Sequence, residues 1–277
     1  MRIAISNIAW DVADDQQVAD ILREHRVDAI DVAPSKYFPD LKTADAGDIA
    51  RVRGWWAERG IEITGMQSLL FGTTGLNVFG TVDSQREMLA HLRAVCRIGA
   101  GLGAQRLVFG SPRNRDRTGM ADAAAHEIAV TFFRQLGDIA AEQGVFVCLE
   151  PNPPCYGANF MTNSGDTAWV VSAVAHPSIR MQLDTGAVTI NEENAREVVT
   201  RYAHLIGHVH ASEPNLVTLG EGGTNHRAVA EALTELLPEQ VVSIEMLAPK
   251  AGSAIDAVRR AVVEAIRYYR SDAGACA

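Results

Sequence analysis

Eight short apolar runs, each followed by a loop and a stretch of helical periodicity, constrain the fold of this 277-residue chain most strongly. The runs are rich in β-branched residues, as buried strands are. They occupy residues 3–6, 28–33, 61–66, 106–110, 145–150, 179–184, 205–210 and 241–246. Eight strand–helix units predict an α/β protein with a single domain, a (β/α)8 barrel of the TIM type, over residues 1–270.

Capping-type residues or early acidic residues mark where most of the helices begin. We expect helix starts at Asp14, Asp45, Ser84, Met120, Ser164, Asn191, Thr224 and Ser253. The segment SDAGACA follows Arg270 and is made of small and polar residues. We therefore predict that residues 271–277 form a frayed tail.

Composition narrows the class of protein. With 47% hydrophobic residues the chain can bury a large core, and its net charge of -9 disfavours nucleic acid and anionic membranes as partners. Its four cysteines form no C-x-x-C pair, so we expect reduced and mostly buried thiols. Neither a signal peptide nor a membrane span is evident. These features predict a cytoplasmic protein. They are compatible with a monomer or with a homo-oligomer.

Four acidic or imidazole side chains stand at the tails of apolar runs: Glu150, Asp184, His210 and Glu245. Successive members are separated by about one strand–helix–strand unit. The carboxyl ends of barrel strands meet at one face, where such barrels build their active sites. We therefore expect the four to converge. Three carboxylates and one imidazole suit one divalent cation such as Mn²⁺, Mg²⁺ or Co²⁺ better than a thiolate zinc site, with Zn²⁺ as an alternative.

The segments around these residues, LEPN, LDTG, HVHASE and SIEM, resemble the sugar isomerase/epimerase group with the xylose isomerase-like barrel. That group includes ketose 3-epimerases, hydroxypyruvate isomerase and, more distantly, endonuclease IV. The resemblance implies that the four residues bind one metal ion, and that Glu150 and Glu245 are also the catalytic acid and base. It implies a metal-dependent isomerase or epimerase that acts on a small keto sugar or polyol ketone through an enediolate.

Two departures from the epimerase pattern affect the substrate contacts. Ala187 stands where the epimerases carry a substrate-binding His, and the loop SEPNLVTLGEGG lacks their Arg. A barrel that binds a sugar or metal without catalysis, as a partner subunit, is therefore an alternative. An endonuclease IV-like phosphodiesterase is less favoured, because its three zinc ions need more His and Asp ligands.

Further residues are candidates for substrate contacts. Arg113, with Arg115 and Arg117, could bind a phosphate or carboxylate, or could belong to a solvated loop with surface ion pairs. His208 lies two residues before His210, so both should face the barrel interior, with His208 beneath the site or touching substrate. Trp10, Phe71 and Tyr156 follow strands and could form apolar walls. The glycines of LGEGGTNH suit a tight turn better than a phosphate site.

Overall fold

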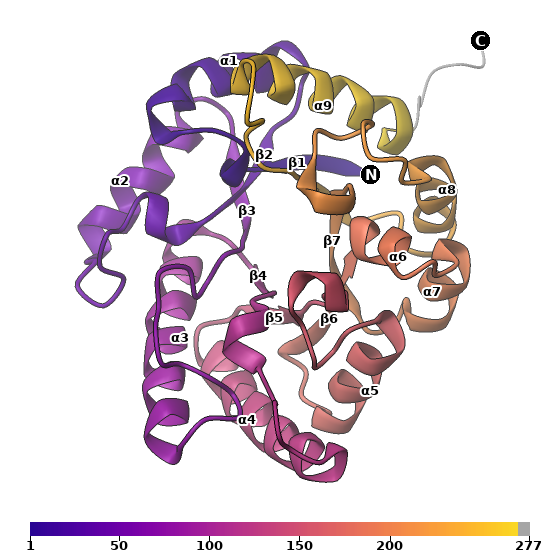
Figure 1. Cartoon of the computed structure of the whole chain (residues 1–277). Helices are drawn as coiled ribbons and strands as arrows, with labels where there is room; N and C mark the ends of the chain where they lie inside the picture. The colour runs from indigo at the N-terminus through magenta and orange to yellow at the C-terminus, as the bar shows by residue number, and fades with distance from the viewer. Residues whose placement is uncertain (271–277) are drawn as a thin grey trace.

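The predicted strands close into one parallel barrel in a computed structural model that describes residues 1–270 (Figure 1). The strands are β1 Arg2–Ser6, β2 Ala29–Val32, β3 Glu62–Met66, β4 Arg106–Phe109, β5 Phe146–Leu149, β6 Ile179–Asp184, β7 Ile206–Ser212 and β8 Val241–Glu245. Each pairs in parallel with the next, and β1 also pairs with β8. The predicted (β/α)8 fold is confirmed. The frayed-tail prediction concerns residues 271–277, which lie outside the described residues.

Helices surround the barrel in Figure 1. They are α1 Asp15–Glu24, α2 Ala46–Ala57, α3 Val82–Leu102, α4 Asp122–Glu142, α5 Ser164–Val174, α6 Thr185–Ile190, α7 Ala195–Tyr202, α8 His226–Leu236 and α9 Ala254–Tyr269. Side-chain caps begin several of them where the sequence predicts: Asp45 caps α2 in a capping box with Asp48, and Ser253 caps α9. No helix of residues 1–270 is long and apolar enough to cross a membrane.

The segment after β6 differs from the prediction of one helix that starts at Asn191. The short helix α6 begins directly after the strand, because the Asp184 carboxylate accepts a hydrogen bond from the Ala187 amide. Asn194 then caps α7. Two other helices begin within two residues of the predicted position: α3 is capped by Thr81 rather than starting at Ser84, and α4 starts after Met120. Thr81 and Ser84 are both suitable N-cap residues for α3, and the local sequence does not show which of them caps the helix.

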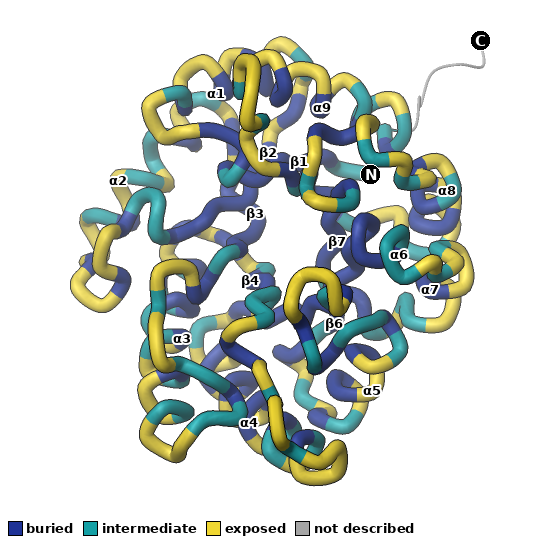
Figure 2. Tube along the Cα trace, viewed as in Figure 1, coloured by how far each residue is buried: buried dark blue, intermediate teal, exposed yellow. Residues whose placement is uncertain are grey.

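Burial follows the layers of the fold. Figure 2 shows buried strands at the centre and exposed residues on the outer faces of the helices. One large apolar cluster fills the space between barrel and helices, and Ala4, Ala29 and Val241 form a second, small cluster. Cys96 is buried in the large cluster and Cys148 is buried on β5, whereas Cys155 is exposed in the loop after β5. Two of the three described cysteines are thus buried, in line with the expectation of mostly buried thiols, and Cys276 lies outside the described residues.

Candidate metal centre

The structure brings together the four side chains predicted to bind a metal. Glu150 directly follows β5, and the other three lie on β6, β7 and β8. The register pairs Asp184 with His210 and places Glu245 beside Ser212. One ligand atom from each of the four lies within 4.8 Å of one from every other. A metal-site-like cluster therefore stands at the carboxyl ends of the strands.

Burial and neighbouring charges together shift the pKa values of the cluster residues. His210 is fully buried, and its Nδ1 lies 3.3 Å from Glu150 Oε1 and 3.2 Å from Glu245 Oε2. Burial lowers the pKa of His210, but the two glutamates outweigh this effect and raise the pKa well above its usual value. Burial, reinforced by the charges of Glu245 and Glu150, raises the pKa of Asp184 well above its usual value. Three carboxylates here require a positive charge among them.

The donor set fits a divalent cation. Glu150 Oε1 and both ring nitrogens of His210 are buried without a hydrogen-bond partner among the described residues. Buried polar atoms without partners are costly, so a ligand that satisfies them is expected. Carboxylate oxygens and one imidazole nitrogen are donors that Mn²⁺, Mg²⁺ or Co²⁺ accept. The identity of the ion and the role of each residue as ligand remain predictions.

Neighbouring polar groups hold the carboxylates in place, and the sequence did not single them out. Gln67 follows β3 and donates from Nε2 to Glu245 Oε1 at 2.6 Å. Ser212 Oγ donates to Asp184 Oδ2 at 2.8 Å. Asn152 Nδ2 donates to Glu150 Oε2 at 3.3 Å. The strand-end position of Gln67 is the one signal that could have revealed it.

The arginine loop after β4 divides into three different environments. Arg113 lines the cavity above the cluster. Arg115 is fully buried, where it donates to the backbone oxygen of Glu150 at 2.7 Å and to Asn152. Burial lowers the pKa of Arg115 to about 10, so it stays charged at neutral pH. Arg117 binds the backbone oxygen of Asn159 and pairs with Asp122. Neither the anion-binding nor the solvated interpretation therefore describes Arg115, which supports the Glu150 loop from below.

Of the other residues predicted to contact substrate, two line the cavity and two are buried away from it. Phe71 and Tyr156 line the cavity, and Phe71 is 76% exposed at its mouth. Trp10 does not line it: the ring is buried, and Nε1 donates to Asp15 at 2.7 Å. His208 is also buried outside the cavity lining, where it pairs with Asp31. The structure thus places Trp10 and His208 in the packed interior.

A cavity of about 730 Å³ opens above the cluster. Glu150, Asp184 and Glu245 reach it from below, and Leu216 and Leu247 also line it. Its volume falls in the usual range for small-molecule sites. Ala187 lies in the wall, where its methyl group leaves space beside Asp184. Position 187, where this chain has Ala in place of the His of the epimerases, therefore lines the cavity.

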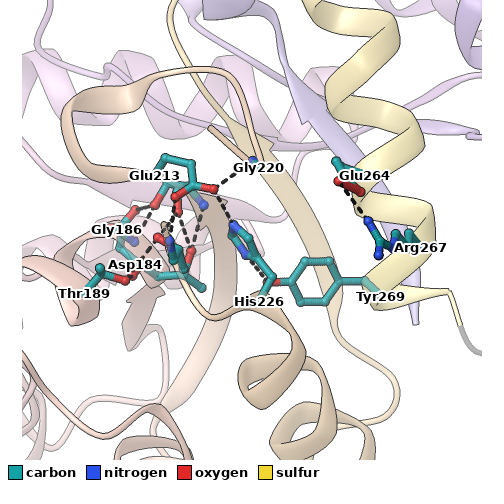
Figure 3. Close-up of polar contacts among 12 residues, drawn as sticks. Asp184, Gly186, Thr189, Glu213, Gly220, His226, Glu264, Arg267 and Tyr269 are labelled. Atoms are coloured by element: carbon teal, nitrogen blue, oxygen red, sulfur yellow. Dashed lines mark hydrogen bonds and ion pairs between the residues drawn. The ribbon is translucent and has the colours of Figure 1, made fainter. Parts of the chain in front are cut away.

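The glycine loop after β7 is organised by a buried carboxylate, Glu213, as Figure 3 shows. Glu213 accepts from the amides of Gly220 and Thr224 at 2.7 and 2.9 Å, and it lies 3.1 Å from His226 Nε2. The His226 ring in turn meets the Tyr269 hydroxyl at 2.7 Å. Gly220 adopts a φ of 92°, as a tight turn requires. Because Glu213 occupies these amides, the loop supports the tight-turn interpretation rather than a phosphate site.

The comparisons with known proteins agree with this architecture. A sequence profile for a family described as "Xylose isomerase-like TIM barrel" matches residues 19–271. No curated protein matches the chain in sequence. A solved D-psicose 3-epimerase with D-tagatose, from Clostridium cellulolyticum H10, has 19% identity and a TM-score of 0.80, with 98% of each chain covered.

Two further solved structures have the same fold. A 3-keto-D-glucoside 4-epimerase from E. coli has 17% identity and a TM-score of 0.77, over 95% of this chain and 98% of its own. A D-allulose 3-epimerase from Methylomonas sp. in complex with D-allulose has 18% identity and a TM-score of 0.75, over 97% of each chain. At these identities the structures establish the shared fold alone.

Proposed function

The chain belongs to the xylose isomerase-like TIM barrel family, and from this premise we propose that it is a divalent-metal-dependent isomerase or epimerase. Its substrate would be a small keto sugar or a related α-hydroxy carbonyl compound. The fold is shared with epimerases whose names refer to psicose, allulose and a keto-glucoside, which supports this substrate class.

One observation carries the proposal: Glu150 and Glu245 approach the same atom of His210 and both reach the cavity. Their carboxylate oxygens lie 3.3 and 3.2 Å from one atom, His210 Nδ1, and both side chains reach the cavity. Two carboxylates on opposite sides of a bound carbon could act as base and acid in turn. Proton removal by one Glu would give an enediolate. Return to the opposite face gives an epimer, and return to the neighbouring carbon gives an aldose–ketose isomer.

The surroundings of Glu245 favour its ionised form, which is the form that can accept a proton. Burial raises the pKa of this carboxyl, but the charge of His210 and the hydrogen bond from Gln67 lower it below its usual value. Glu245 is therefore ionised at neutral pH and able to accept a proton. A divalent cation held by Glu150, Asp184, His210 and Glu245 would supply Lewis acidity that makes the substrate C–H bond more acidic.

The test is solvent isotope incorporation. The protein, supplied with Mn²⁺, Mg²⁺ or Co²⁺ in turn, is incubated with a panel of ketoses and inososes in D₂O. We expect deuterium on the carbon next to the carbonyl, with Glu150→Gln and Glu245→Gln losing both exchange and product. Product formed at a normal rate without deuterium would instead indicate hydride transfer or a shielded proton.

A non-catalytic binding protein is the second candidate, and Ala187 favours it, because the epimerases carry a substrate-binding His at this position. The same panel separates the two functions. Metal bound at the cluster without exchange or product from any sugar would support the binding protein. Exchange with any member of the panel would support the enzyme.

A further inference from the structure

A second polar layer lies beneath the metal centre. Gln182, His208 and Ser243 each stand two residues before a member of the cluster, on β6, β7 and β8. Side chains two apart on a strand point to the same side, so these three face the barrel interior one layer below. All three are fully buried. A barrel core is normally filled by apolar side chains, so this layer needs an explanation.

A polar contact joins His208 of this layer to Asp31, on the opposite side of the barrel. Asp31 lies on β2, and its Oδ2 is 2.7 Å from His208 Nε2. Thr64 donates to the other oxygen of Asp31 at 3.1 Å. Asp31 and His208 are both fully buried. Because an ionised carboxylate only accepts, His208 carries its proton on Nε2 and keeps a lone pair on Nδ1.

The neighbouring strand makes room for this contact. Gly65 on β3 is paired in register with Asp31. A side-chain carbon at Gly65 would lie 2.5 Å from Asp31 Oδ1 and 2.7 Å from its carboxyl carbon. The absence of a side chain at Gly65 therefore lets the Asp31 carboxylate lie inside the barrel.

The Asp31–His208 pair lies next to the metal centre because the His208 ring packs against the ring of His210. The rings of His208 and His210 meet edge to face, with centroids 5.2 Å apart. His208 Nδ1 and His210 Nε2 are both buried without a hydrogen-bond partner among the described residues. When His210 Nδ1 serves the cluster as a ligand, its Nε2 carries the proton. His208 Nδ1 is then an acceptor and His210 Nε2 a donor, and neither atom has another hydrogen-bond partner among the described residues.

A separate metal ion on Asp31, His208 and His210 is the other interpretation of these residues, because their ligand atoms also lie within 4.8 Å of one another. The direct contact between Asp31 and His208 Nε2 opposes it, since each would give up its ligand atom. The position of His210 Nδ1 beside two glutamates opposes it as well.

We propose that Asp31 and His208 are positioning residues for His210. Asp31 accepts the Nε2 proton of His208. With a metal ion on His210 Nδ1, His208 Nδ1 would accept the Nε2 proton of His210, a hydrogen bond that the described residues do not form in this structure. This series of hydrogen bonds would keep the Nδ1 lone pair of His210 directed at the cluster. The inference rests only on the metal-binding part of the proposed function, and it holds whether or not the protein turns over a sugar.

The test is Asp31→Asn. The amide can donate to His208 Nε2, so His208 would carry its proton on Nδ1 and could no longer accept from His210. We expect Mn²⁺ affinity, measured by titration calorimetry or chelator competition, to fall about tenfold to a hundredfold, the scale of other losses around metal ligands. Asp15→Asn is the matched control: Asp15 is a buried carboxylate that accepts from Trp10 and Tyr37 away from the cluster. Its metal affinity should be unchanged.

Two further measurements separate positioning from general damage. Nitrogen-15 NMR of the metal-free protein should show His208 protonated on Nε2 in wild type and on Nδ1 in Asp31→Asn. His208→Gln keeps an acceptor for His210 and should bind Mn²⁺ within about threefold of wild type, whereas His208→Leu should lose about tenfold or more. Adding Asp31→Asn to His208→Gln should change little.

Three results would overturn the proposal. One is wild-type Mn²⁺ affinity in folded Asp31→Asn, and another is an unchanged His208 tautomer in that variant. Should Asp31→Asn not fold, equal affinity in the His208→Gln and His208→Leu proteins would be the third. A wild-type protein that binds no divalent metal would contradict the proposed function itself, and the tautomer of His208 would still decide whether Asp31 orients it.

Discussion

Gln67 Nε2 lies 2.6 Å from Glu245 Oε1, so a side chain at the end of β3 fixes a carboxylate at the end of β8. The two residues are 178 positions apart. The contact leaves Glu245 Oε2 facing His210 Nδ1 at 3.2 Å. The direction of this carboxylate is therefore set from across the barrel.

Replacing Gln67 by Leu should leave Glu245 free to rotate. We expect metal affinity and kcat to fall by tens-fold, the effect typical of losing a hydrogen bond to a metal ligand. Metal titration and steady-state kinetics at saturating metal measure the two effects. Gln67→Glu, which places a fourth carboxylate there, should be worse than Leu at neutral pH. Wild-type affinity in Gln67→Leu would mean that the bond is incidental.

His210→Ala should abolish stabilisation by metal. An ion that binds only the folded protein adds about 2.7 kcal/mol at a hundred times its Kd, so wild type should gain several degrees of Tm with Mn²⁺. The variant should gain none. His176→Ala is the control, because this partly buried imidazole contacts Asp138 away from the cluster. An equal metal-induced rise in Tm in both variants would contradict His210 as a ligand.

Glu213 should make stability depend on acid pH. Burial raises its pKa, but the hydrogen bonds from His226, Thr224 and Gly220 lower it to about 2, against an ordinary value of 4.5. A lowered folded pKa means that the stabilisation is complete above pH 4.5 and is lost as pH falls toward 2. The loss is on the order of 3 kcal/mol. Urea unfolding between pH 5 and 2 should show a shallower decline for Glu213→Gln. Parallel pH curves would contradict this.

Arg113 should matter only for an anionic substrate. It lines the cavity, and no carboxylate in residues 1–270 forms an ion pair with it. Arg113→Ala should raise KM for a phosphorylated or carboxylated ketose about tenfold to a hundredfold, since a charged hydrogen bond is worth roughly 1.5–3 kcal/mol. KM for neutral sugars on the same variant is the control. If only neutral sugars react, and equally well with both proteins, Arg113 has no role in recognition.

Gly65→Ala should destabilise the barrel. The added carbon would lie 2.5 Å from Asp31 Oδ1, and overpacking a tight core costs about 1–3 kcal/mol. Gly54→Ala is a matched control, because nothing lies within 4 Å of a side-chain carbon at this position inside α2. That variant should gain about 0.5–1 kcal/mol from helix propensity. Thermal unfolding of both proteins measures the difference, and equal stability would show that Asp31 can move at no cost.

The fold and the convergence of the four cluster residues follow from local pattern and one topological rule. Apolar runs of strand length that alternate with helical periodicity are properties of neighbouring residues. The carboxyl ends of parallel barrel strands share one face whatever the details of packing. The sequence alone therefore predicts that Glu150, Asp184, His210 and Glu245 lie together. The start of α6 does not follow from local pattern, because Asp184 serves both as candidate ligand and as helix cap.

Contacts between side chains of distant strands were decided by the tertiary structure alone. Whether Gln67 meets Glu245, or Asp31 meets His208, depends on strand register and on the space that Gly65 leaves. Arg115 is buried rather than solvated because its loop folds beneath Glu150, and Trp10 turns inward to Asp15. Local sequence encodes which way a side chain leaves its strand. Its partner across the barrel is determined by how all eight strands close.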